Sequence, residues 1–125
     1  GSHVAGIIGA LRDNATGIEG IAGAPGAVKL MVVRAVPNGD EHDKDIANAI
    51  RYAVDNGAQV INMSFGKDFS PDKPLVDAAV KYADSKGVLL VHAAGNDGEN
   101  LAETPSFPVA RYASAGSAAN WIEVA

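Results

Sequence analysis

The segment Val91–Gly98 reads Val-His-Ala-Ala-Gly-Asn-Asp-Gly, and its residue types and spacing point most directly to chemistry. It follows the apolar run 88–90 and ends in residues that permit sharp turns, so we expect Asn96 at the C-terminal tip of a buried strand. Ligands bind at such tips in α/β proteins. A side-chain N–H held there can donate to negative charge that develops only in a transition state. Taken alone, the segment also fits a plain turn after a strand.

Two further segments stand upstream of Asn96. Residues 1–6 read Gly-Ser-His-Val-Ala-Gly, and residues 60–66 read Val-Ile-Asn-Met-Ser-Phe-Gly. With residues 93–98, they resemble three consecutive blocks of the subtilisin-like serine peptidases, or subtilases: H-G-(T/S)-H-V-A-G, V-I-N-M-S-(L/F)-G and A-A-G-N-(D/E)-G. The order and approximate spacing match the family. The resemblance covers nearly all of the 125 residues.

Helical and strand-like patterns alternate along the chain. Apolar residues at helical spacing predict helices within residues 4–11, 46–54 and 75–83, and apolar runs predict strands at 29–36, 60–63, 88–93 and 121–124. We expect Asp43 to cap the second helix and Gly57 to end it. Continuously apolar strands joined by helices predict an α/β fold with a parallel sheet buried on both faces. The resemblance likewise implies part of a three-layer, mostly parallel, subtilisin-like domain.

The resemblance also implies roles for individual residues. Asn96 corresponds to the side-chain donor of the oxyanion hole. The strand edge that pairs with the substrate backbone corresponds to Ser64, Phe65 and Gly66. The opposite wall of the pocket for the side chain before the scissile bond corresponds to Ala93, Ala94 and Gly95, whose small size predicts a roomy apolar pocket. The other substrate-binding strand corresponds to Arg34, Ala35 and Val36. Spacing alone favours ordinary strand ends in a sheet for all three segments.

No member of a catalytic triad is expected within residues 1–125. By resemblance, the catalytic histidine would directly precede Gly1, the aspartate would lie further upstream, and the serine would lie downstream. We therefore expect a single fragment of a catalytic domain, inactive by itself. Gly1-Ser2-His3 also matches a common expression-vector remnant, although His3 fits the family's second, structural histidine. Ser117 lies in Gly-Ser-Ala-Ala, which lacks the proline of the nucleophile block, and no base is expected near it.

The catalytic chemistry needs no cofactor, but residues 12–18 resemble a calcium loop of many subtilases. Its oxygen donors would come from Asn14, or alternatively Asp13, and from Thr16 and Ile18. Calcium takes six to eight oxygen ligands, so this loop supplies too few by itself. A glycine-rich surface turn is an equally good interpretation.

Two residues depart from the family pattern. Lys67 stands where a second glycine is frequent, and it could change the charge of a substrate subsite. His92 stands where a small or β-branched residue is common, and we expect it to be a packed core histidine.

Composition excludes several classes of partner. The net charge of −5 provides no electrostatic footprint for nucleic acid, and no apolar run is long enough to span a membrane. With no cysteine, the chain has no disulfide and no cysteine-based metal site. The resemblance implies a polypeptide substrate and a secreted or extracytoplasmic location, and nothing indicates an oligomeric state.

Two alternatives remain open. One is a catalytically inactive subtilase homologue that serves as a binding or structural module. The other is an unrelated α/β nucleotide-binding domain. The second is disfavoured because the chain contains neither G-x-G-x-x-G nor a Walker lysine.

Overall fold

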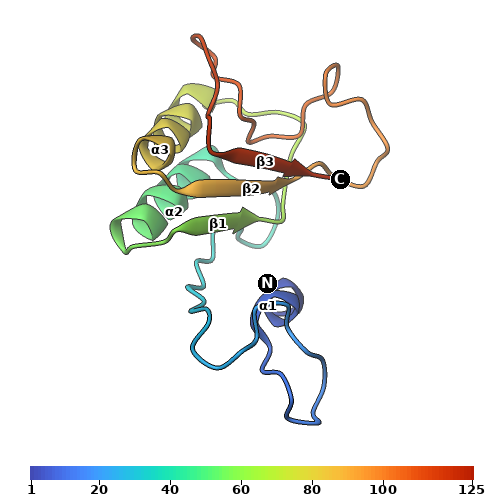
Figure 1. Ribbon diagram of the computed structural model, residues 1–125. Coiled ribbons are helices and arrows are strands. Elements are labelled where there is room, and N and C mark those ends of the chain that lie inside the picture. Colours follow the sequence, from blue (N-terminus) through green and yellow to red (C-terminus); the bar gives the residue numbers. More distant parts are fainter. The chain divides into compact units, whose positions relative to one another are not determined.

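A three-stranded parallel sheet organises residues 33–125 in the computed structural model, which describes the whole chain from residue 1 to 125 (Figure 1). The strands are β1 (Val60–Met63), β2 (Leu89–Ala93) and β3 (Trp121–Val124), in the order β1-β2-β3. β1 and β2 are joined through α3 (Lys73–Ser85), whereas β2 and β3 are joined by a long segment without a helix. The parallel sheet and these three predicted strands are confirmed.

Both helices of this unit, α2 (Asp43–Asp55) and α3, lie on one side of the sheet (Figure 1). Burial alternates along the strands accordingly: Met63 and Leu90 are at most 2% exposed, whereas Val60 and Val124 are at least half exposed. The helices supply the other half of the core, with Ile46, Ala47, Ile50, Val76, Ala79, Val80 and Ala83. Two of the three expected layers are therefore present within residues 33–125, and the second sheet face of this unit is open to solvent.

The ends of the two helices follow the glycine and proline signals in the sequence. Gly57 follows the C-terminal cap of α2 and has a φ of +85°, a conformation that glycine adopts without steric cost. Gly87 plays the same part after α3, with a φ of +72°. Pro74 lies in the first turn of α3, where its missing N–H removes no helical hydrogen bond. None of the helices is long and apolar enough to cross a membrane.

Asp43 does not cap α2 as predicted. The N-cap is His42, and Asp43 is the first helical residue. Its buried carboxylate lies 2.6 Å from the ammonium of Lys67 and accepts the N–H of Asp72 at 2.7 Å. The ammonium also donates to the carbonyl of Glu41 at 2.8 Å. The capping prediction is wrong because this carboxylate neutralises a largely buried cation, a requirement that sequence-local capping rules do not register.

The predicted strand at residues 29–36 is also wrong. None of its backbone groups hydrogen-bonds to another backbone group, and Val32 is 83% exposed. A strand needs a neighbour to satisfy its N–H and C=O groups, and β-propensity alone supplies none.

Residues 1–32 form a separate compact unit around α1 (Ser2–Gly9). The predicted helix is confirmed, although it ends before the exposed Leu11. Ile21 and Ala22 donate their N–H groups at 2.8 Å to the last turn of α1, where carbonyls lack helical partners. Glycine is required at residue 20, directly before Ile21, because a Cβ there would overlap the backbone of Ala10.

The ion pair of Asp43 and Lys67 gives a stability prediction. Replacing Asp43 with asparagine leaves the Lys67 ammonium largely buried without a counter-charge. We expect the free energy of unfolding to fall by about 3–5 kcal/mol at neutral pH. Urea unfolding of the wild type and the Asp43→Asn variant measures this loss, and Asp40→Asn, on an exposed loop, is the matched control.

The same pair should make stability depend on acid pH. Burial by itself raises the pKa of Asp43, but hydrogen bonds from Lys67, Asp72 and Ser70 outweigh it and hold the pKa below its usual value. The carboxylate therefore stabilises the fold above its unfolded pKa of about 3.9, and this contribution is lost as the pH falls below that value. The difference in the free energy of unfolding between the wild type and Asp43→Asn should decrease on acidification. A difference that does not depend on pH would contradict the lowered pKa of Asp43.

Candidate functional site

The register of β1 and β2 brings two of the predicted segments to one edge of the sheet. Met63 pairs with His92, so Ser64–Gly66 and Ala93–Asn96 leave the sheet side by side. They share a hollow of about 280 Å³, which we call the edge hollow. It is lined by Ser64, Phe65, Gly66, Asp68, Ala93, Ala94, Gly95, Asn96, Asp97, Glu99, Leu101, Thr104 and Ser106. The predicted shared edge is confirmed.

Asn96 lies on the wall of the edge hollow directly after a sharp turn. Gly95 has a φ of +95°, and the N–H of Ala94 still bonds to the carbonyl of Val124 at 2.7 Å. The side chain of Asn96 is exposed and makes no hydrogen bond to another protein group. Its N–H groups are therefore available to a ligand in the edge hollow.

The opposite wall is built where Gly66 meets Ser106. Lys67 and Phe107 exchange backbone hydrogen bonds of 3.2 and 2.8 Å, which bring residue 106 against Gly66. A Cβ at Gly66 would collide with the hydroxyl of Ser106. The Lys67 side chain turns to Asp43 and is not part of the lining, so the expected effect of Lys67 on the charge of a subsite is not supported.

His92 lies behind this wall as a packed core histidine, as predicted. It is 1% exposed, and its Nδ1 lies 2.7 Å from Oε1 of Glu123. The other carboxylate oxygen accepts the indole N–H of Trp121 at 2.7 Å. The Phe65 ring and the imidazole pack edge to face, with their ring centroids 6.5 Å apart. Nε2 is buried without a hydrogen-bond partner and lies 3.7 Å from the position that a Cβ of Gly66 would take.

Comparison with known proteins identifies the family. A profile of the subtilase family matches residues 1–125. The thermophilic serine proteinase of Bacillus sp. (strain AK1) is 46% identical over 107 residues, or 85% of this chain and 25% of that protein. Thermitase of Thermoactinomyces vulgaris is 40% identical over 86% of this chain and 37% of its own length. The structure of a mutant of the protease domain of PatA superposes with a TM-score of 0.75 at 29% identity, covering 98% of this chain and 41% of that one.

The chain belongs to the subtilase family. This membership confirms the resemblance and the partial subtilisin-like α/β fold, and it excludes an unrelated nucleotide-binding domain. The chain spans only 25–37% of the length of the two relatives described above. One relative is named as an extracellular protease, one as a cell wall-associated protease and one as an intracellular protease.

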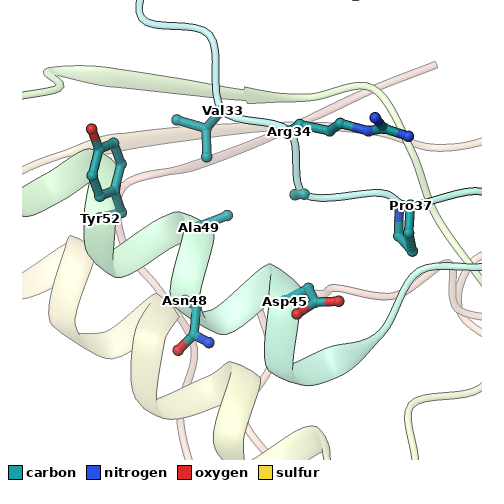
Figure 2. Close-up of a pocket in the computed structure, with 8 residues that line it drawn as sticks. Val33, Arg34, Pro37, Asp45, Asn48, Ala49 and Tyr52 are labelled. Carbon is teal, nitrogen blue, oxygen red and sulfur yellow. The ribbon is translucent and has the colours of Figure 1, made fainter.

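The third substrate-binding segment expected of a subtilase lies elsewhere. Arg34 and Ala35 line a separate hollow of about 450 Å³, and Val36 lines neither hollow. Figure 2 shows Val33 and Pro37 pointing toward α2, which carries Asp45, Asn48, Ala49 and Tyr52, whereas the Arg34 side chain extends away from that helix. Arg34 donates to the side-chain oxygen of Asn38 at 3.2 Å. The structure therefore does not bring this segment to the edge hollow, because it lacks the strand pairing that would align it with β1.

The expected calcium loop is folded as a self-contained turn. The side-chain oxygen of Asn14 accepts the N–H of Thr16 at 3.0 Å, and its carbonyl accepts the Thr16 hydroxyl at 3.2 Å. Asp13 donates its N–H to Glu19, and Ile18 is 56% exposed. No group of three or more His, Cys, Asp or Glu side chains converges in the chain. Residues 12–18 by themselves supply fewer than the six to eight oxygen ligands that calcium takes, so the calcium loop stays a prediction.

Sequence reasoning missed the polar character of the edge hollow. Three acidic residues, Asp68, Asp97 and Glu99, are among those that line it, whereas the small residues Ala93, Ala94 and Gly95 alone predict an apolar pocket. Asp97 directly follows Asn96, and Asp68 stands two residues after Gly66, so proximity to the motifs was an available signal. Glu123 was also missed, although His92 and Glu123 stand opposite each other in the β2–β3 register.

The contact between Gly66 and Ser106 gives a prediction for this wall. Gly66→Ala should lower the free energy of unfolding by about 1 kcal/mol, at the low end of the cost of overpacking, because the Ser106 side chain must rotate away. The double variant Gly66→Ala with Ser106→Ala should recover most of that loss, since only the hydroxyl stands in the way. Urea unfolding of the four proteins measures this. A loss that Ser106→Ala does not relieve would contradict the contact.

Proposed function

We propose that this chain is a central part of the catalytic domain of a serine endopeptidase, in which Asn96 donates to the oxyanion. One observation carries the proposal: in a chain of the subtilase family, Asn96 shares a single hollow with both expected substrate-binding segments, Ser64–Gly66 and Ala93–Gly95. An exposed side-chain amide without a protein partner can donate a hydrogen bond to negative charge that develops in a transition state.

In the intact enzyme, a serine hydroxyl would attack the peptide carbonyl while a histidine takes its proton and an aspartate orients that histidine. The carbonyl oxygen would become negatively charged, and the Asn96 N–H would stabilise it more strongly than it stabilises the ground state. The substrate backbone would lie along Ser64–Gly66 and form main-chain hydrogen bonds. Gly66, without a side chain, would leave room for that approach. Arg34–Val36 would bind substrate only where a neighbouring strand aligns them.

The 125 residues alone should lack this activity. Two serines, Ser106 and Ser117, are candidate nucleophiles, but neither has a base within hydrogen-bond reach to activate it. Ser117 pairs with Arg111 in an isolated antiparallel bridge, and its side chain makes no hydrogen bond. Ser106 lines the edge hollow, but Nε2 of His92 has no hydrogen-bond partner at all. A nucleophilic serine requires a base within hydrogen-bond reach.

We therefore predict that the isolated chain does not hydrolyse casein or chromogenic peptides above the buffer rate. The measurement is made with and without a serine-directed phosphonate, and the full-length protein is the positive control. Hydrolysis by the isolated chain would contradict this prediction if the phosphonate abolishes it.

The role of Asn96 is tested in the full-length protein with Asn96→Leu, which keeps the size of the side chain and removes the donor. We expect kcat to fall by about 10²–10³, the magnitude measured for the corresponding residue of subtilisin itself. KM should change little, because ground-state binding would come from the strand edges.

If Asn96 only shapes the turn after Gly95, leucine should lower the melting temperature while each folded active site retains its kcat. Active-site titration, steady-state kinetics and a thermal melt on one preparation separate the two outcomes. The same titration tests the alternative of a catalytically inactive homologue, which would bind peptides but titrate no nucleophile.

Two further parts of the proposal rest on the family alone. A structural calcium ion would take oxygen atoms from Asn14, Thr16 and Ile18, with its remaining ligands supplied by other residues. A secreted or extracytoplasmic location agrees with the names of two relatives, whereas a third is named as intracellular.

A further inference from the structure

Two Asn-Gly pairs occur in the chain, Asn38–Gly39 and Asn56–Gly57, and both are exposed. In such a pair the backbone nitrogen of the glycine can attack the asparagine side chain, because glycine has no side chain that would cover this nitrogen. We propose that Asn38 is a site of spontaneous deamidation in the folded protein, whereas the end of α2 protects Asn56. This inference does not depend on the proposed function.

The reaction at Asn38 needs only water and hydroxide. Hydroxide removes the proton of the Gly39 N–H, and the nitrogen forms a bond to Cγ of Asn38. The bond from Cγ to Nδ2 breaks, and Nδ2 takes a proton from water and leaves as ammonia. Water then opens the resulting cyclic imide at either of its carbonyl groups. One opening gives an aspartyl residue, and the other gives an isoaspartyl residue, in which the main chain runs through the former side chain.

The reacting groups of Asn38 and Gly39 are unrestrained. Neither the N–H of Gly39 nor the side-chain N–H groups of Asn38 donate to another protein group. The chain bends here outside any helix or strand, and Gly39 has a φ of +119°. The attacking nitrogen and the leaving amide are therefore both free to reach the geometry of ring closure.

Arg34 favours the attack on Asn38. Its guanidinium donates to Oδ1 of Asn38 at 3.2 Å. Attack on Cγ places negative charge on this oxygen, and a positively charged donor that is already in place stabilises that charge. The aspartyl product would convert the hydrogen bond into an ion pair with Arg34. Deamidation would therefore change the charge beside the third segment expected to bind substrate, Arg34–Val36.

Asn56 is also exposed and also precedes glycine, but hydrogen bonds hold its reacting groups. It is the C-terminal cap of α2. Its Nδ2 donates to the carbonyl of Tyr52 at 2.8 Å, and the N–H of Gly57 donates to the carbonyl of Val54 at 3.1 Å. Ring closure must break both bonds, which should slow it by about tenfold or more relative to Asn38.

The test follows both sites in one sample of the folded full-length protein. The serine-directed phosphonate is added first, so that the protein cannot digest itself. Incubation then takes place in mildly alkaline water enriched in heavy oxygen, which labels only the residues that react during the incubation. Trypsin cleavage after Arg34, Lys44, Arg51 and Lys67 gives the peptides 35–44 and 52–67, each with a single Asn-Gly pair. Mass spectrometry with fragmentation should show Asn38 reacting about tenfold or more faster than Asn56.

Controls separate the fold from the local sequence. In guanidinium chloride the two rates should become similar, because unfolding releases Asn56 from α2. Asn38→Gln should remove the labelled product from peptide 35–44. Arg34→Gln, whose tryptic peptide spans residues 30–44, should slow the reaction at Asn38 by about 2–5-fold and leave Asn56 unchanged, a small factor because the contact is exposed. Thermal melts verify that both variants are folded.

Equal rates at the two sites of the folded protein, a faster reaction at Asn56 or no reaction at Asn38 would overturn the inference. A rate ratio that persists unchanged in guanidinium chloride would also overturn it, because the local sequence and not the fold would then set the ratio.

Discussion

The parallel pairing of β1 with β2 is the constraint on which the site depends. Met63 stands opposite His92, and three residues beyond Met63 the chain reaches Gly66, while four beyond His92 it reaches Asn96. Because side chains alternate between sheet faces, a shift of one residue in this register would turn Leu90 and His92 out of the core. The buried side chains of α2 and α3 pack on the same face and therefore hold the register as well as the fold. Core packing and site geometry are consequences of one set of contacts.

A second constraint links the helical layer to the edge hollow through charge. The carboxylate of Asp43 begins α2, and the ammonium of Lys67 follows Gly66 directly. Their pairing fixes the start of the helix against the segment that leaves β1. It also directs the Lys67 ammonium away from the edge hollow, so Lys67 is not among the residues that line the hollow. Removing either partner would therefore lower the stability of the fold.

Much of the fold follows from local sequence patterns. The three paired strands are mostly apolar, and α2 and α3 carry apolar stripes at helical spacing. Gly57 and Gly87, with positive φ values, follow the ends of these helices. The shared position of Ser64–Gly66 and Asn96 was also predictable, because parallel strands place all their carboxyl ends at one edge. These features depend on residues close in sequence or on a general rule of chain topology.

The sequence by itself thus determined the family, the parallel sheet and the meeting of Gly66 with Asn96. Only the tertiary structure decided which charges reach the edge hollow. It paired Asp43 with Lys67 across α2 and β1, placed Glu123 on the imidazole of His92 across β2 and β3, and left residues 29–36 without a strand partner. The physical reason is common to all three. Each outcome depends on which groups far apart in sequence are close enough to satisfy one another, and local propensity contains no information about that distance.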